Sequence, residues 1–331
     1  MRTNITILGA GSWGTAMAQC FAQNGHGIKL WHRNHKVAHK IQTTRINHKY
    51  FPQHRLHDNI EVVSDWHQSI EHAQIIILAI PTSNLSYFLR YIFSNIHDDQ
   101  VVLNASKGLD HQQQRTISQW IENQISTVVM QKHYGVLSGP SFASEVMEQK
   151  PTGIMLALHD AQKRASIKAA LHSSRFQVFE TSDIKGVEIA GALKNTIAIT
   201  VGASDVLAFG LNTRAALLTK GQEEISKIGM ALGARPETFW GLAGMGDLIL
   251  TCTGDLSRNR RVGKKLAEGK TIRQILKELG QIAEGVRTTK TAFYLSQELN
   301  VQTPILRETY YAIFKGKPLQ QAVETILLEM K

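Results

Sequence analysis

The sequence predicts an α/β domain with a doubly wound, mostly parallel sheet, followed by an all-α domain. An apolar run at residues 5–8 leads directly into a glycine-rich turn and then into a helical pattern. Short apolar runs alternate with helical patterns as far as about residue 180, whereas beyond Ser182 only helical periodicity is evident. The 331 residues suffice for two domains, which we expect to comprise residues 1–182 and 183–331.

The first turn carries Gly9, Gly11 and Gly14 in a G-x-G-x-x-G pattern. Behind it, apolar side chains recur with helical spacing until Gly25 ends the helix. In such a strand–turn–helix the first glycine permits the turn, the second lets a pyrophosphate approach, and the third lets helix and strand pack closely. The helix start offers N–H groups to phosphates. The sequence therefore predicts a Rossmann fold that binds a dinucleotide at this turn.

Eight runs with strand character follow one another in the first half. Several are continuously apolar, as is typical of parallel strands buried on both faces, and helical patterns between the early runs supply right-handed crossovers. We expect strands at residues 4–8, 28–31, 61–63, 75–80, 101–104, 135–137, 153–158 and 176–179.

The second half shows seven helical segments. Pro304 and Pro318 stand at helix starts, where the missing N–H is harmless. A second glycine-rich segment, Gly241–Asp247, does not combine a preceding strand with a following helix, so we do not expect a second dinucleotide site there. We interpret it as a loop whose backbone is closely approached. The expected helices are 183–202, 213–232, 257–268, 271–279, 286–299, 304–315 and 318–330.

The composition excludes several classes of protein. No apolar run approaches the ~18 residues of a membrane span. The two cysteines, Cys20 and Cys252, form no CxxC pattern, which argues against a disulfide or zinc site and fits a cytoplasmic location. Nine of the 14 histidines lie between His26 and His72. No cysteine or carboxylate completes a ligand set there, so we expect no metal and place these histidines on the surface.

The net charge of +10 admits two interpretations. A basic surface binds nucleic acid, but it also attracts small anions such as phosphorylated substrates. We favour small anions and expect no nucleic-acid partner, because the glycine-rich turn already requires a phosphate ligand.

The end of the second expected strand indicates which dinucleotide binds. An acidic residue about 20 residues beyond the loop would bind the ribose 2′-hydroxyl and favour NAD(H). The chain here continues from Trp31 into Arg33 without an acid. Arg33 is placed to pair with a 2′-phosphate, which indicates NADP(H) as an accepted cofactor; the alternative is an ordinary surface arginine.

Two lysines are candidates for chemistry. Lys107 follows the strand at 101–104, at the sheet edge where ligands bind; otherwise it is a solvated loop residue. Lys194 has small or apolar neighbours one helical turn away on either side. Burial would lower its pKa and suit it to proton transfer; alternatively its head reaches water.

Three polar segments accompany these lysines. Ser141 follows the strand at 135–137 and either caps a helix or faces a ligand. Asp247 orients a lysine, accepts a substrate hydroxyl or caps a helix. Ser257 is expected to cap a helix whose free N–H groups, together with Arg258, form a phosphate site; the alternative is a solvated basic face.

Together these segments resemble the NAD(P)-dependent glycerol-3-phosphate dehydrogenases of the bacterial type. The resemblance covers nearly the whole chain, and the joint order of the motifs is specific although each motif alone is not. The motifs are GAGSWGTA at residues 9–16, NASKGL at 104–109, GPSFASEV at 139–146, ALKNTIAI at 192–199, GLAGMGDLILTCTG at 241–254, SRNRRVG at 257–263 and AEGVRT at 283–288.

The resemblance implies a reaction and residue roles. Such enzymes reduce dihydroxyacetone phosphate to sn-glycerol 3-phosphate, a phospholipid precursor, and are usually homodimers whose two domains close over a cleft. It implies Lys194 as the general acid/base, with Lys107 and Asp247 beside it; all three also contact the substrate. Further implied substrate contacts are Gly139, Ser141, Ser257, Arg258 and Asn259. Implied contacts to NADP(H) or NAD(H) are the glycine-rich turn, Ser12, Trp13, Arg33, Lys107, Ala143, Arg258, Ile282 and Glu284.

Two alternatives remain open. A related two-domain dehydrogenase acting on a β-hydroxy acid or on ketopantoate would share both halves and the lysine, but it needs no phosphate site such as residues 257–259. A non-catalytic NADP(H) sensor, or a nucleic-acid binder, would use the same loop or charge without the chemistry.

Overall fold

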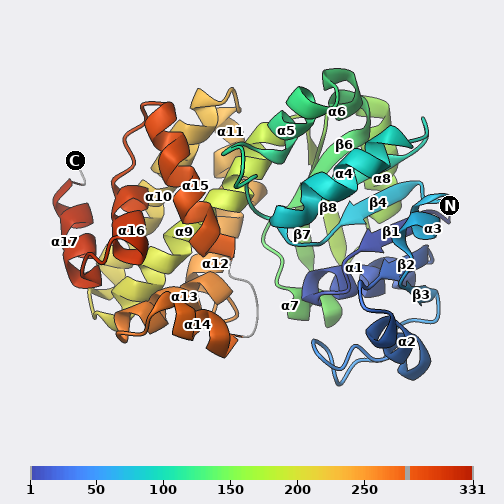
Figure 1. Cartoon of the computed structure of the whole chain (residues 1–331), viewed down its shortest axis with the longest axis horizontal. Coiled ribbons are helices and arrows are strands. Elements are labelled where there is room, and N and C mark those ends of the chain that lie inside the picture. The colour runs from blue at the N-terminus through green and yellow to red at the C-terminus, as the bar shows by residue number, and fades with distance from the viewer. Residues whose placement is uncertain (1, 280–283, 330–331) are drawn as a thin grey trace. The chain divides into compact units, whose positions relative to one another are not determined.

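The computed structural model describes residues 2–279 and 284–329 (Figure 1). The chain divides into two compact units. The first unit comprises residues 1–106 and 121–184, and the second comprises residues 107–120 and 185–331. The division at residues 182 and 183 stays a prediction, but no sequence pattern indicated that residues 107–120 belong to the helical unit.

Side-chain hydrogen bonds hold residues 107–120 within the second unit. The carboxylate of Glu188 accepts the N–H of Ser118 (3.1 Å) and its hydroxyl (2.5 Å). Nδ1 of His111 lies 2.8 Å from the hydroxyl of Thr291. Lys107 is therefore carried by the same unit as Lys194.

In the described residues, the first unit contains one eight-stranded sheet in the order β3-β2-β1-β4-β5-β6-β7-β8. Neighbouring strands are parallel except β6 and β7, which are antiparallel. The predicted fold class is confirmed, and all eight expected strands are present. They are β1 (Asn4–Leu8), β2 (Gly27–Trp31), β3 (Ile60–Val63), β4 (Ile75–Leu78), β5 (Val101–Asn104), β6 (Tyr134–Ser138), β7 (Thr152–Leu158) and β8 (Phe176–Thr181).

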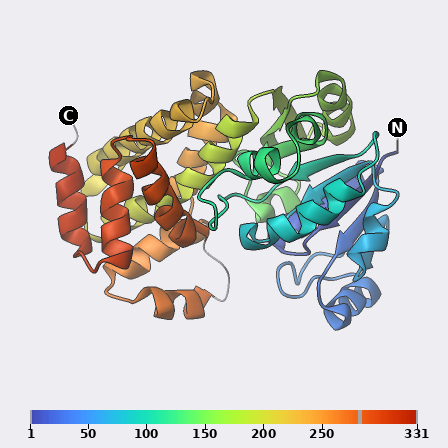
Figure 2. The same ribbon diagram turned by 45° about the horizontal axis from the view of Figure 1, so that its top comes forward.

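Helices cover both faces of this sheet (Figure 2). Ile5 and Ile7 of β1 join a core formed with α1, α2, α7 and α8. On the other face, Trp31 of β2 packs against Phe88 of α4, with ring centroids 5.4 Å apart. Burial on both faces explains the continuous apolar runs. These helices are α1 (Ser12–Gln23), α2 (His35–Thr44), α3 (Trp66–Ile70), the 3-10 turn η1 (Thr82–Asn84), α4 (Leu85–Ser94), α5 (Ile117–Gln124), which begins in the second unit, α6 (Thr127–His133), α7 (Ala143–Met147) and α8 (Ala161–Leu171).

In its described residues the second unit is helical, as predicted. Three segments between residues 236 and 253 were not expected as helices: α11, the π-helical turn η2 and α12. None of the described helices is both long and apolar enough to cross a membrane. The helices are α9 (Ile184–Val206), α10 (Gly210–Ala231), α11 (Pro236–Trp240), η2 (Leu242–Gly246), α12 (Asp247–Thr253), α13 (Arg258–Ala267), α14 (Ile272–Leu279), α15 (Glu284–Glu298), α16 (Pro304–Phe314) and α17 (Leu319–Glu329).

A buried glutamate caps one of these helices from a distance. Glu224 of α10 accepts the N–H groups of Ile305 (2.7 Å) and Leu306 (3.1 Å), in the first turn of α16. The N-cap residue of α16, Thr303, provides no side-chain cap. Burial raises the pKa of Glu224 to about 7.

Each unit has its own core, and each core contains one cysteine. Cys20 of α1 lies in the core of the first unit, and Cys252 of α12 lies in that of the second. Both thiols are free. Burial raises the pKa of Cys20 to about 12 and also raises that of Cys252.

Candidate active site

The glycine-rich turn after β1 has the geometry that a bound pyrophosphate requires. Gly9 has a φ of +126°, and a Cβ there would lie 2.3 Å from the carbonyl oxygen of Ala79. A Cβ on Gly14 would lie 1.9 Å from the carbonyl oxygen of Gly9, so only glycine lets α1 pack this closely. The Cβ position of Gly11 has nothing within 4 Å. The turn is therefore closed on the protein side and open at Gly11, which fits a dinucleotide.

The start of α1 adds hydrogen-bond donors to this turn. The N–H of Ala10 donates to the carbonyl oxygen of Trp31 (2.9 Å), which fixes the turn against the end of β2. The N-cap of α1 is Gly11, which makes no side-chain cap. Ser12 and Trp13 are the first residues of the helix, and backbone N–H groups at this position are suited to a phosphate.

Arg33 lies two residues beyond β2 and is exposed. The next residue, Asn34, caps α2 by accepting the N–H of Val37 with its side chain (3.1 Å). Arg33 thus stands in the short connection that follows the strand against which the glycine-rich turn is fixed. This position suits a contact with the 2′-phosphate of NADP(H), and the contact itself stays a prediction.

The segment after β6 also belongs to the first unit. Gly139 has a φ of +154°, and the hydroxyl of Ser141 donates to its carbonyl oxygen (3.0 Å). The alternative that Ser141 caps a helix is wrong. The Ser141 hydroxyl bonds to the backbone of the turn at Gly139 instead of to a helix start. Helix α7 begins at Ala143, and its N-cap residue, Phe142, provides no side-chain hydrogen bond. Ala143 packs against the core of the first unit.

In the second unit, Asp247 lies between two lysines. Its Oδ2 is 2.8 Å from Nζ of Lys107, and its Oδ1 pairs with Nζ of Lys194. Lys194 also donates to the hydroxyl of Thr251 (2.7 Å). The exposed fractions of the side chains are 23% for Lys107, 4% for Lys194 and 2% for Asp247. The predictions that Lys194 is buried and that Asp247 orients a lysine are confirmed.

The buried lysine titrates near neutral pH. Burial lowers the pKa of Lys194 from its usual 10.5 to about 7; attraction to Asp247 opposes this, and repulsion from Lys107 adds to it. A group with a pKa near the working pH can both donate and accept a proton.

The interpretation of Gly241–Asp247 as a loop is wrong, because the segment opens a helix, although helix α11 and not a strand precedes it. The π-helical turn η2 leads directly into α12, and Asp247 is the first residue of α12. A Cβ on Gly244 would lie 2.1 Å from the carbonyl oxygen of Phe239, so this glycine permits a close backbone approach within the protein. The N-cap of α12 is Gly246, which leaves the Asp247 carboxylate to pair with the two lysines.

A second polar group of residues forms at the start of α13. The hydroxyl of Ser257 accepts the N–H of Arg260 (3.3 Å), which confirms the predicted N-cap. Asn259 is buried; its Nδ2 donates to Oδ1 of Asn195 (2.7 Å), and its Oδ1 accepts the N–H of Gly285 (3.1 Å). Arg258 is the first residue of the helix and is exposed. Since Asn195 follows Lys194 on α9, the helix start and the lysine lie close together.

Sequence reasoning missed two members of this site. Thr251 lies one turn after Asp247 in a helix that was not expected, so the sequence did not indicate that the two side chains share one face. Asn195 stands beside Lys194 within the ALKNTIAI motif, and this adjacency was the available signal.

Two further predicted cofactor contacts are Ile282 and Glu284. Ile282 falls outside the described residues. Glu284 is the first residue of α15, and its Oε2 lies 3.9 Å from Nε2 of His111. Its contact with a cofactor stays a prediction.

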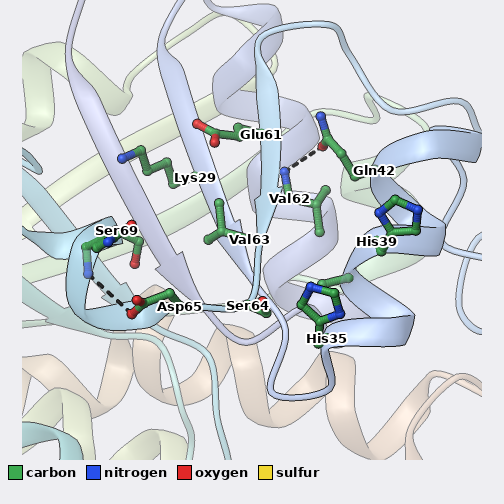
Figure 3. Close-up of a pocket in the computed structure, with 12 residues that line it drawn as sticks. Lys29, His35, His39, Gln42, Glu61, Val62, Val63, Ser64, Asp65 and Ser69 are labelled. Atoms are coloured by element: carbon green, nitrogen blue, oxygen red, sulfur yellow. Dashed lines mark hydrogen bonds between the residues drawn. The ribbon is translucent and has the colours of Figure 1, made fainter.

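A cavity of about 280 Å³ lies beside edge strand β3, which supplies part of its lining (Figure 3). Its lining includes His35 and His39 of α2, both exposed, and Gln42, whose Oε1 accepts the N–H of Val62 (2.7 Å). The lining residues include none of the predicted site residues. The hydrogen bond to Gln42 occupies the N–H of Val62 on the edge strand, which discourages pairing of this edge with another chain.

We expected the histidines between His26 and His72 to lie on the surface, and this expectation is wrong for His26. His26 is buried; its Nδ1 accepts the N–H of Thr3 (3.2 Å), and its Nε2 lies 2.7 Å from the carbonyl oxygen of Ala170. Among residues 2–279 and 284–329, no group of three or more potential ligand side chains is arranged to hold a metal.

A dinucleotide-binding turn in one unit and a buried lysine paired with a carboxylate in the other are typical of nicotinamide-dependent dehydrogenases with a Rossmann domain and a helical domain. Family models for the N-terminus and the C-terminus of NAD-dependent glycerol-3-phosphate dehydrogenase match residues 4–164 and 183–324. The chain belongs to the NAD-dependent glycerol-3-phosphate dehydrogenase family.

Individual relatives agree with the family match. The chain is 39% identical to a glycerol-3-phosphate dehydrogenase (NAD(P)+) of Geobacter sp. (strain M21), over 98% of this chain and 96% of the relative. The crystal structure of glycerol-3-phosphate dehydrogenase from Coxiella burnetii aligns with a TM-score of 0.92 and 33% identity over 99% of both chains. A 2-dehydropantoate 2-reductase from Methylococcus capsulatus shares the fold alone, at 16% identity over 96% of this chain and 97% of that chain, with a TM-score of 0.55.

Proposed function

We propose that this protein reduces dihydroxyacetone phosphate to sn-glycerol 3-phosphate with NADPH or NADH, and catalyses the reverse reaction. The observation that carries the proposal is the buried pair of Lys194 and Asp247 close to a capped helix start. This arrangement combines a proton donor that titrates near neutral pH with a site suited to a phosphate. A β-hydroxy acid or ketopantoate would require the first feature but not the second.

In the proposed mechanism, a bound nicotinamide cofactor would supply the hydride that the substrate carbonyl carbon receives. Nζ of Lys194, in its ammonium form, donates a proton to the carbonyl oxygen as negative charge develops there. Asp247 keeps this ammonium oriented, and Lys107 adds positive charge that stabilises the developing alkoxide. In the reverse direction, neutral Lys194 accepts the proton.

The substrate phosphate is proposed to bind at the start of α13. The helix dipole and the N–H groups of its first turn favour an anion, and Arg258 adds a guanidinium suited to two phosphate oxygens. Ser257 and Asn259 fix the backbone of this turn. Because the phosphate does not react, its binding energy can position the carbonyl. Gly139 and Ser141 are proposed as further substrate contacts.

The cofactor is proposed to bind at the glycine-rich turn. Gly9, Gly11 and Gly14, with the N–H groups of Ser12 and Trp13, would hold the pyrophosphate. Further proposed contacts are Arg33 to the 2′-phosphate, and Lys107, Ala143, Arg258, Ile282 and Glu284.

NADPH oxidation in the presence of dihydroxyacetone phosphate tests the reaction. We expect turnover, and we expect Lys194→Ala to abolish it with little change in the Kd for NADPH. Turnover only with a hydroxy or keto acid would refute the substrate assignment, and wild-type rates in Lys194→Ala would refute the mechanism. Arg258→Ala tests the phosphate site, because it should impair dihydroxyacetone phosphate far more than unphosphorylated dihydroxyacetone.

We further propose a homodimer that acts in the cytoplasm, supplies phospholipid synthesis and binds no nucleic acid. Two buried, free cysteines fit a reducing compartment, and a small phosphorylated substrate accounts for the positive charge. Light scattering of the purified protein tests the dimer, and a duplex titration at physiological salt tests nucleic-acid binding.

A further inference from the structure

A charged cluster that the mechanism does not use lies next to the start of α13. Oδ2 of Asp205, near the end of α9, accepts Nε (3.0 Å) and Nη2 (2.7 Å) of Arg260. Its Oδ1 accepts Nε (2.9 Å) and Nη2 (2.5 Å) of Arg214. We propose that Asp205, acting through Arg260, is a positioning residue that holds the first turn of α13 where the substrate phosphate binds. This inference rests on the proposed function and extends it to residues without a catalytic role.

The pair is built for fixed geometry. The exposed fraction of the side chain is 11% for Asp205 and 7% for Arg260. A guanidinium that donates two hydrogen bonds to one carboxylate has a defined orientation, and removing one partner of a buried pair leaves the other uncompensated. Arg260 also donates to Asp255 (2.5 Å), but the Asp255 side chain is 85% exposed. An exposed pair of this kind contributes little.

Arg260 lies in the same helical turn as the backbone N–H groups that the phosphate is proposed to contact. Its N–H is the one capped by Ser257, so its main chain is part of the first turn of α13. A Cβ on Gly202 of α9 would lie 2.1 Å from its carbonyl oxygen. A Cβ on Gly263, further along α13, would lie 1.9 Å from the carbonyl oxygen of Ile199. The two helices thus meet backbone to backbone at Arg260, and its side chain extends to Asp205.

The same helix carries the proposed proton donor. Lys194 and Asp205 are eleven residues apart on α9, which corresponds to about three turns and about 16 Å, so both project from one side of the helix. At one end Asn195 bonds Asn259, and at the other Asp205 bonds Arg260. The start of α13 is therefore attached to α9 at two points, and α9 sets its distance from the Lys194 amino group.

Loss of the Asp205 contact should displace the phosphate site without touching the reacting atoms. In Asp205→Asn, we expect kcat/KM for dihydroxyacetone phosphate to fall by about 10- to 100-fold, mainly through KM, because small displacements of binding groups have effects of this size. For unphosphorylated dihydroxyacetone we expect a change of less than about threefold. The Kd for NADPH should not change. Asp255→Asn is the matched control, because it removes the exposed partner of the same arginine, and we expect wild-type constants.

Two further variants keep the test decisive if Asp205→Asn does not fold. Arg260→Lys keeps the charge but loses the planar fork, and Asp205→Glu keeps the carboxylate. We expect Arg260→Lys to show the same loss of kcat/KM, selective for the phosphorylated substrate. We expect Asp205→Glu to lose less than Asp205→Asn does. Equal losses for both substrates, or no loss in any variant, would overturn the inference. A wild-type protein inactive on dihydroxyacetone phosphate would instead refute the proposed function, which separates the two failures.

Discussion

Replacing Asp247 with asparagine should shift the pH range in which the protein reduces a carbonyl group. In the proposed mechanism reduction requires the ammonium form of Lys194. The rate should therefore be maximal below the pKa of Lys194 and should be lost as the pH rises through about 7. Asp247 raises this pKa, whereas burial and Lys107 lower it. Asparagine preserves the shape and a hydrogen-bond acceptor but removes the negative charge.

The size of the shift follows from the contact. A carboxylate in direct contact with a charged group typically changes its pKa by about 1 to 3 units. A pKa that falls by this amount from about 7 leaves little ammonium at neutral pH. At pH 7 the rate of reduction should therefore fall roughly 5- to 500-fold, with recovery at lower pH.

The assay is the initial rate of NADPH oxidation with dihydroxyacetone phosphate from about pH 5 to about pH 9, compared as kcat/KM. Lys107→Gln is the matched variant, because it removes a positive charge beside Lys194 and should move the same limb to higher pH. Opposite shifts are expected from the two variants. An unchanged limb in Asp247→Asn, or shifts in the same direction, would refute the assignment of the limb to Lys194.

Three further predictions concern the cofactor and the stability of the fold. Gly14→Ala should lower Tm and abolish NADPH binding because its Cβ has no room, whereas Gly11→Ala should keep Tm and weaken NADPH binding alone; calorimetry and a binding titration separate them. Arg33→Asp should weaken NADPH binding with little loss for NADH, and equal losses would rule out the 2′-phosphate contact. Because the pKa of Glu224 is raised to about 7, the folded state holds this proton more tightly than the unfolded chain. Stability should fall by up to about 3 kcal/mol between pH 4.5 and 7, and urea unfolding of Glu224→Gln should show a flatter pH dependence.

The sheet was predictable because its signal is local. Ile75–Leu78 is apolar throughout and Ile5–Leu8 is apolar except at Thr6, and in a strand buried on both faces every residue contributes to that pattern. The roles of the three glycines were also readable, since each has its own steric environment. Lys194 was recognised by its small and apolar neighbours along α9.

The remainder depends on contacts between segments that are distant in the sequence. Asp247 belongs to a glycine-rich segment whose local preference is for a loop, and its carboxylate pairs with Lys107 and Lys194, which lie far from it in the sequence. Asn259 is held by Asn195 across a helix interface that no periodicity reveals. Glu224 caps a helix some eighty residues away, and Ser118 is held by Glu188 from another helix. Such pairs have no local pattern, so sequence periodicity cannot indicate them.

The distribution of the two cysteines has an experimental consequence. Cys20 lies in the core of the Rossmann unit and Cys252 in the core of the helical unit. Cys252 directly follows Thr251, whose hydroxyl accepts a hydrogen bond from Lys194. Because both thiols are buried and protonated, neither should react with an alkylating reagent until its surroundings open. The rate at which each thiol is labelled, resolved by peptide mass, therefore reports the opening of one unit independently of the other. The wild-type chain thus contains two internal probes, with which ligand-induced stabilisation can be assigned to the dinucleotide side or to the substrate side without introducing any label.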